Sequence, residues 1–281
     1  MTGDFRTPGV DMVSVEELHI YPLKSGRGIA KSAVRLAATG LEWDRNWMIT
    51  DAAGGFLTQR THPNLARIET SLSATSLTLR APDLPPLELP FAFQGEAVGV
   101  QVWKDRCEGL DQGQGASEWA SAVLEKSVRL VRVPGISKRV ANPEYAGPQV
   151  APVAFADGFP ILVCNRASLD DLNARMPEPL PMARFRPNVV LNGLEPFAED
   201  RIASVRIGAV TLKLVKPCTR CVITSTDQST GERSMNPLPY LREFRFDRNL
   251  LGVTFGENAV VAAGVGASIE RGAECVITFD S

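Results

Sequence analysis

A chain of 281 residues can form one large or two ordinary domains, and 44% hydrophobic with 22% charged residues is the composition of a soluble globular protein. A formal net charge of −2 gives no electrostatic reason to expect nucleic acid or an anionic membrane as a partner. The odd number of cysteines, five, and the lack of an apolar run in the first twelve residues predict reduced thiols in a cytoplasmic protein with a loose N-terminal tail and no secretion signal or membrane anchor.

Short β-rich runs separated by turn residues dominate the first part of the chain. Their spacing predicts a mixed or antiparallel sheet that closes into a barrel. A helix is expected at 117–126, where Trp119 and Val123 belong to an apolar stripe that is typical of a core contact. The runs expected to be strands are 13–22, 34–36, 46–50, 56–58, 77–79 and 98–102.

The remainder of the chain predicts a second β-rich unit with short helices. A strand at 128–133 precedes an irregular segment, 134–152, which we expect to be a long functional loop or an inter-domain crossover. Ser168 to Asp171 has the form of a capping box and predicts a helix over 169–176. Alternation around Gly208-Ala209 predicts a hairpin that leads to a cysteine pair. The other expected elements are strands at 161–163, 259–261 and 275–279 and a helix at 241–246.

The cysteine pair carries the strongest chemical signal, because Cys218 and Cys221 flank a cation, Arg220. A nearby cation favours the thiolate, which binds a soft metal or attacks an electrophile better than a thiol does. A structural zinc site needs about four ligands, and the chain has no second Cys-x-x-Cys and only two histidines. A thioredoxin-like pair usually opens a helix, whereas the β-branched run 222–226 predicts a strand. Two buried structural cysteines are the ordinary alternative, and the spacing does not say which sulfur would be functional.

The run Lys-Pro-Cys-x-Arg-Cys-x-x-Thr-x-x-Asp at 216–227, followed by Thr230-Gly231, resembles the signature of the MOSC family of molybdenum-cofactor proteins. The chain is similar in particular to the mitochondrial amidoxime-reducing component and its bacterial relatives. The resemblance implies a mainly β fold with a few helices (α+β). It places an N-terminal β-rich, barrel-like domain at 13–127 and a C-terminal MOSC β-barrel domain at 128–281. Matching stretches follow in the same order along nearly the whole chain, at 20–25, 40–47, 155–160, 167–173, 184–190 and 255–258.

By this resemblance the chain would hold the molybdenum cofactor (Mo-molybdopterin), with Cys221 as metal ligand and catalytic residue and Cys218 as a structural or tuning neighbour. Cations and hydroxyl groups suit the cofactor's phosphate, and a soft thiolate suits the metal. Some of these positions also have a structural explanation: a solvated lysine at 24, an arginine at 45 stacked on tryptophan, or a loop hydrogen-bond network around 186 and 188. Pyridoxal phosphate binding is a further expectation for the chain. The positions that match the family's cofactor-binding residues are Lys24, Ser25, Arg45, Gly158, Phe159, Arg186, Asn188, Thr219, Arg220 and Cys221.

The function implied by the resemblance is a molybdenum-dependent oxidoreductase that reduces N-hydroxylated compounds such as amidoximes, hydroxylamines and N-hydroxylated bases. The chain lacks the cysteine cluster of the ferredoxin-like domain found in some bacterial relatives. Electrons are therefore expected from a separate protein, a ferredoxin, a flavodoxin or a cytochrome with its reductase, and neither nucleic acid nor a membrane is expected as a partner. The alternative from another class is a carrier of sulfur or of the cofactor that uses a cysteine persulfide. Such a carrier would need Cys221 but would have little use for the full set of cations.

Overall fold

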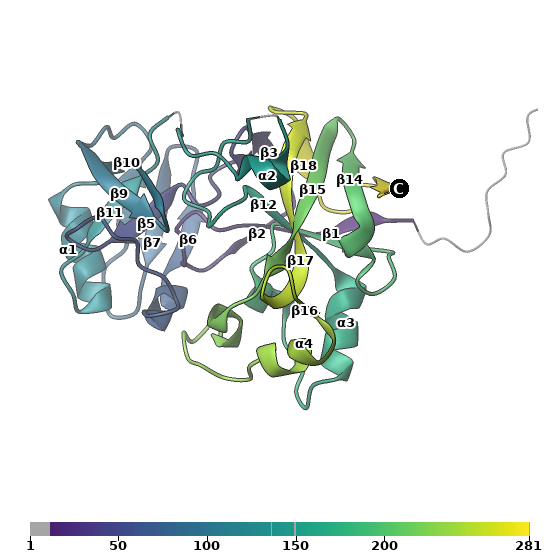
Figure 1. Cartoon of the computed structure of the whole chain (residues 1–281). Helices are drawn as coiled ribbons and strands as arrows, with labels where there is room; N and C mark the ends of the chain where they lie inside the picture. The colour runs from purple at the N-terminus through teal and green to yellow at the C-terminus, as the bar shows by residue number, and fades with distance from the viewer. Residues whose placement is uncertain (1–11, 136, 149, 281) are drawn as a thin grey trace, which may run out of the picture.

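The computed structural model describes residues 12–135, 137–148 and 150–280, which form two β-rich lobes lying side by side (Figure 1). The predicted class, mainly β with a few helices, is confirmed: strands dominate the described residues, and the helices are short. The N-terminal tail expected at 1–12 lies, except for its last residue, outside the described residues.

The larger lobe is built on a nine-stranded sheet with the order β19-β14-β15-β17-β12-β13-β1-β2, in which β16 also pairs with β17. One face is covered by α3 (Arg166–Ala174) and α4 (Leu238–Phe244), and the other packs on a small sheet of β18 (Ser268–Glu270), β3 (Ala33–Ala37) and β4 (Gly40–Leu41). The strands of the large sheet are β1 (Ser14–Ile20), β2 (Ile29–Lys31), β12 (Ile161–Asn165), β13 (Val189–Asn192), β14 (Ile202–Ile207), β15 (Val210–Thr219), β16 (Phe246–Asp247), β17 (Gly252–Ala263) and β19 (Cys275–Phe279).

The smaller lobe combines two sheets and one helix around a core that includes Trp47, Leu65 and Leu130. The helix α1 (Gln114–Leu124) buries Trp119 and Ala120 in this core, as its apolar stripe predicts. A four-stranded sheet has the order β5-β11-β10-β9, and a three-stranded sheet has the order β6-β7-β8. Their strands are β5 (Trp47–Thr50), β6 (Glu69–Leu72), β7 (Ser76–Arg80), β8 (Leu87–Pro90), β9 (Ala97–Val102), β10 (Asp105–Asp111) and β11 (Arg129–Arg132).

Strand pairing does not divide the chain at one point. The first strand, β1, pairs with β13 of the large sheet, and β3 pairs with β18 near the C-terminus. Conversely, β11 pairs with β5 and β10 of the smaller lobe. The proposed division into 13–127 and 128–281 stays a prediction, and this boundary does not coincide with a boundary between sheets.

Three local predictions are corrected by the structure. The helix α3 begins earlier than the capping box indicated, because Asn165 caps it by accepting from Ala167 N, while Ser168 Oγ donates to the buried Glu199. The segment expected as a strand at 56–58 forms only a bridge between Thr50 and Phe56. The β-branched run after the cysteines is a 3₁₀ turn, η4 (Val222–Ser225), and not a strand.

Three further features complete the fold. The hairpin predicted around Gly208-Ala209 is confirmed, since β14 and β15 pair directly on either side of it. Within its described residues, the irregular segment 134–152 contains one short helix, α2 (Pro143–Ala146). Three other 3₁₀ turns connect the strands: η1 (Pro63–Arg67), η2 (Met182–Phe185) and η3 (Ala198–Arg201).

Candidate functional site

One cavity of about 160 Å³ is lined by residues from both lobes. Its walls come from the turn after β1, the turn before β5, the segments before β12 and β13, and the end of β15 with η4. Segments far apart in the sequence therefore share one space. All ten positions named from the sequence line it: Lys24, Ser25, Arg45, Gly158, Phe159, Arg186, Asn188, Thr219, Arg220 and Cys221.

The two cysteines of the motif lie in different environments at the end of β15. Cys221 is partly exposed and starts the turn η4, where its carbonyl accepts from the backbone N and the Oγ1 of Thr224. These bonds fold the β-branched run back on itself, which explains why it is not a strand. Arg220 Nη1 donates to Cys218 Sγ at 2.9 Å and Arg220 Nη2 to Phe185 O at 2.6 Å. The cation between the two thiols is thus hydrogen-bonded to Cys218, whereas Cys221 remains available within the cavity wall.

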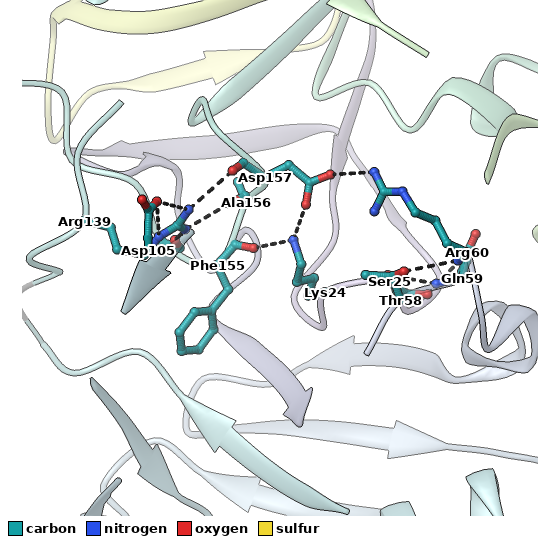
Figure 2. A network of polar contacts seen from close by, with 11 residues as sticks. Lys24, Ser25, Thr58, Gln59, Arg60, Asp105, Arg139, Phe155, Ala156 and Asp157 are labelled. Carbon is teal, nitrogen blue, oxygen red and sulfur yellow. Dashed lines mark hydrogen bonds and ion pairs between the residues drawn. The ribbon is translucent and has the colours of Figure 1, made fainter. Parts of the chain in front are cut away.

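Lys24 is held by a carboxylate and is not the solvated lysine of the structural alternative (Figure 2). Its Nζ donates to Phe155 O at 2.8 Å and to Asp157 Oδ1 at 2.5 Å. Desolvation lowers the pKa of Lys24, and Asp157 opposes that effect. Burial disfavours ionisation of Asp157, but Lys24 and Arg60 outweigh it and hold the pKa of this carboxyl well below its ordinary value. Asp157 is therefore an ionised group that balances part of the positive charge in the wall.

A buried arginine, Arg139, supports the segment that carries Asp157 (Figure 2). Arg139 donates to the carbonyls of Ala154, Ala156 and Asp157 and, through Nε and Nη2, to Asp105 at the start of β10. Five N–H groups of a guanidinium can be used in this way because its donors are fixed in one plane. The arginine comes from the irregular segment 134–152, so this segment helps to shape the cavity wall.

Arg45 and Asn188 belong to one hydrogen-bond network. Arg45 Nη1 donates to Asp44 Oδ2 at 2.6 Å and to Asn188 Oδ1 at 3.0 Å, while Asn188 Nδ2 donates to His19 O at 3.1 Å. The guanidinium carbon of Arg45 lies 4.3 Å from the ring centre of Tyr21. Arg45 therefore stacks on an aromatic ring, but on tyrosine and not on the tryptophan considered as its structural explanation. Asn188 is 1% exposed and orients Arg45, which is the loop network considered as its structural explanation.

Arg186 differs from the other cations because it is buried without a carboxylate among the described residues. Its Nη1 donates to Gln228 Oε1 at 2.8 Å, its guanidinium carbon lies 4.2 Å from the Tyr21 ring centre, and Nη2 is buried without a partner. Burial lowers the pKa of Arg186 to about 10. A desolvated cation without a counter-ion is costly unless an anion is supplied.

The residues present fit an anionic, metal-bearing cofactor. Five cations line the cavity (Lys24, Arg45, Arg60, Arg186 and Arg220), against one lining carboxylate, Asp157, and one buried beside Arg45, Asp44. Three guanidinium nitrogens in this wall are buried without a partner: Arg60 Nη1, Arg186 Nη2 and Arg220 Nε. Excess positive charge with free donors suits a phosphate-bearing group, and the neighbouring thiol of Cys221 suits a soft metal.

Backbone strain also concentrates here. Ser25, Arg45 and Arg186 have positive φ angles of 66°, 49° and 56°. Left-handed conformations are costly for residues other than glycine, and they persist where surrounding contacts enforce them. Position 28 requires glycine for a different reason, because a Cβ there would lie 2.5 Å from Tyr21 Cε1. The glycine thus allows the close approach of the aromatic ring on which both guanidinium groups stack.

Several residues that line the cavity or support its wall are not identified by the sequence. Asp157 lies inside the stretch 155–160 that resembles the family, but the sequence did not indicate that its carboxylate pairs with Lys24 and Arg60. Gln59, Arg60, Arg139 and Gln228 carry no motif at all, and only their tertiary contacts identify them. All five cysteines are free: Cys107, Cys164, Cys218, Cys221 and Cys275.

Known proteins resemble this chain over both lobes. Residues 12–127 match the MOSC N-terminal beta barrel domain, and residues 151–275 match the MOSC domain. Mitochondrial amidoxime-reducing component 1 of Mus musculus is 35% identical over 248 residues, which are 83% of this chain and 71% of that protein. Mitochondrial amidoxime reducing component 2 of Homo sapiens is 34% identical over 83% of this chain and 72% of that protein.

Among solved structures, the YUAD protein of Bacillus subtilis is similar over 94% of this chain and 94% of its own, at 10% sequence identity and a TM-score of 0.41. Within the part of the chain that the structure describes, no helix is long and apolar enough to cross a membrane.

Proposed function

The chain belongs to the MOSC family, and on that premise we propose that it is a molybdenum-cofactor-dependent oxidoreductase that reduces N-hydroxylated compounds. The observation that carries the proposal is the cavity wall itself. It places the buried Arg186 and the partly buried Arg220, neither with a carboxylate partner among the described residues, in the same space as the partly exposed Cys221. Curated relatives with 35% and 34% identity are named as amidoxime-reducing components, which supports the choice of substrate class.

In this proposal each group has one task. Cys221 would hold the metal, and Arg186 and Arg220 would hold anionic groups of the cofactor with the donors that have no protein partner. Ser25 and the backbone at Gly158 and Phe159 would contact its remaining polar edges. Asn188 and Asp44 keep Arg45 in place, and Asp157 keeps Lys24 and Arg60 in place.

When bound, the cofactor would supply two-electron oxygen-atom transfer, and the protein would contribute binding, orientation and electrostatics. The substrates proposed are amidoximes, hydroxylamines and N-hydroxylated bases. Reduction of an N–OH group to N–H with release of water takes up two electrons and two protons. We propose that the electrons come from a separate protein, a ferredoxin, a flavodoxin or a cytochrome with its reductase. The excess positive charge of the wall would also attract an acidic donor protein.

We propose a cytoplasmic location on the argument of reduced cysteines, all five of which are free. The relatives named above are mitochondrial proteins, so the location of this chain is tested by fractionating the cells that produce it. Pyridoxal phosphate is left out of the proposal, because neither the matched domains nor the named relatives support it.

The test is metal analysis of the protein purified from a host that makes molybdopterin. We expect about one molybdenum per chain and reduction of benzamidoxime with an artificial electron donor. Cys221→Ser should lose this activity while the fold remains, because an oxygen donor of similar size replaces the soft ligand. If the protein takes up persulfide sulfur but never molybdenum, while a molybdenum enzyme from the same host is loaded, the sulfur-carrier alternative replaces this proposal.

A further inference from the structure

Two glutamine side chains, one buried and one partly buried, join the lobes next to Arg186. Gln59, which lies between β5 and η1, has no exposed surface, and Gln228 lies in the loop that follows η4. Gln59 Nε2 donates to Gln228 Oε1 at 3.0 Å, and Gln228 Nε2 donates back to Gln59 Oε1 at 2.9 Å. The two residues are 169 positions apart in the sequence, so this reciprocal pair exists only in the folded chain.

The amide groups of this pair have no unused donor. Gln59 Nε2 also donates to Ser25 O at 2.7 Å, and Gln228 Nε2 also donates to Thr226 O at 3.1 Å. Gln228 Oε1 also accepts from Arg186 Nη1 at 2.8 Å. The pair is therefore the middle of a continuous chain of hydrogen bonds from Ser25 to Arg186. These two residues are far apart in the sequence, and both line the cavity.

The chemistry of the amide matters because of the charge on Arg186. A carboxylate at position 228 would orient the guanidinium but would also neutralise it, and the cation would then attract an anion less strongly. A neutral amide oxygen fixes the guanidinium without cancelling its charge. Lys24 and Arg45, in contrast, have carboxylate partners. Arg220 also has none among the described residues, but its partners are Cys218 Sγ and Phe185 O, whereas Arg186 is held by the amide of Gln228.

We propose that the Gln59–Gln228 pair positions Arg186 and Ser25 for the anionic cofactor while leaving the charge of Arg186 available. This inference rests on the proposed function and extends it to two residues that no motif identifies. Both are positioning residues, since they reach the cavity through Arg186 and Ser25. A merely structural connection between the lobes is the competing explanation, and it predicts a change in stability alone.

The experiment compares four variants with the wild-type protein from the molybdopterin-producing host. Gln228→Met and Gln59→Met remove the amides at similar size, and Gln228→Glu keeps an acceptor for Arg186 but adds the neutralising charge. Gln112→Met is the matched control, because Gln112 is also buried and bonded, to Trp47 and to Leu110 O, but lies outside the cavity. The readouts are molybdenum and pterin per chain, their half-life after dilution, and the denaturation midpoint of the cofactor-free protein.

We expect all three variants of the pair to release the cofactor about tenfold faster or more, as the loss of one bond to a charged group implies. Gln112→Met should lose stability but release the cofactor at the wild-type rate. The inference is overturned if Gln228→Glu retains the cofactor as well as wild type does, because charge would then be irrelevant. It is also overturned if the two methionine variants of the pair release the cofactor no faster than Gln112→Met. Absence of molybdenum from every preparation, wild type included, would instead overturn the proposed function together with this inference.

Discussion

Replacement of Arg186 by methionine is expected to stabilise the cofactor-free protein. The guanidinium is buried, and its pKa is lowered from 12.5 to about 10, which corresponds to a penalty of up to about 3 kcal/mol at neutral pH. Loss of the hydrogen bond to Gln228 and of the contact with Tyr21 would return about 2 kcal/mol of that gain. The net expectation for Arg186→Met is a stabilisation of about 1 kcal/mol, or roughly 2–4 °C in Tm.

The pH dependence of this difference follows from the sign of the shift. The folded chain binds fewer protons than the unfolded chain only between the folded pKa of about 10 and the unfolded value of 12.5. The penalty is therefore complete below pH 10 and fades only as the pH rises through that value. The stability gain of Arg186→Met should accordingly be the same at pH 6 and pH 8.

The assay is denaturant unfolding of cofactor-free wild type, Arg186→Met and a control, Arg45→Met. The control removes the partner of the buried Asp44 and is expected to destabilise by about 3–5 kcal/mol. In parallel, Arg186→Met should retain at least about tenfold less molybdenum than wild type. A loss of 2 kcal/mol or more in the cofactor-free Arg186→Met protein would refute the reasoning, because Arg186 would then be a satisfied structural residue and not an uncompensated cation.

Three further predictions address the cysteine pair and two buried charged residues near the cavity. Cys221→Ser should abolish benzamidoxime reduction and Cys218→Ser should reduce it only mildly; equal losses in the same assay would contradict the choice of ligand. Burial raises the pKa of Glu257 to about 9 from 4.5, so the folded chain holds a proton that the unfolded chain releases, and stability should fall as the pH rises through this window. Glu257→Gln should remove that fall in denaturation midpoints measured at pH 5 and pH 9, and an unchanged slope would disprove it. Arg139→Lys should destabilise the protein by about 2–4 kcal/mol and lower its activity, because a lysine ammonium cannot replace all the hydrogen bonds that the guanidinium donates to the backbone carbonyls around Asp157. A wild-type melting temperature and turnover would contradict this.

The sequence determined the elements whose pattern is local. Short β-rich runs between turn residues marked many of the strands, and the alternation around Gly208-Ala209 marked the hairpin that ends at the cysteines. The order of the quoted stretches identified the family and the ten positions that line one cavity. These features are readable because side-chain periodicity and short motifs are properties of neighbouring residues.

Tertiary structure decided everything that depends on which groups meet. The run after Cys221 has strand propensity, yet bonds from Thr224 and from Arg233 to its carbonyls fold it into a turn. The bond that fixes Arg220 to Phe185 O, and the lack of a carboxylate partner at Arg186, follow from how distant segments meet. Pairwise energies at a few ångströms decide the charge of a buried site, and sequence separation says nothing about those distances.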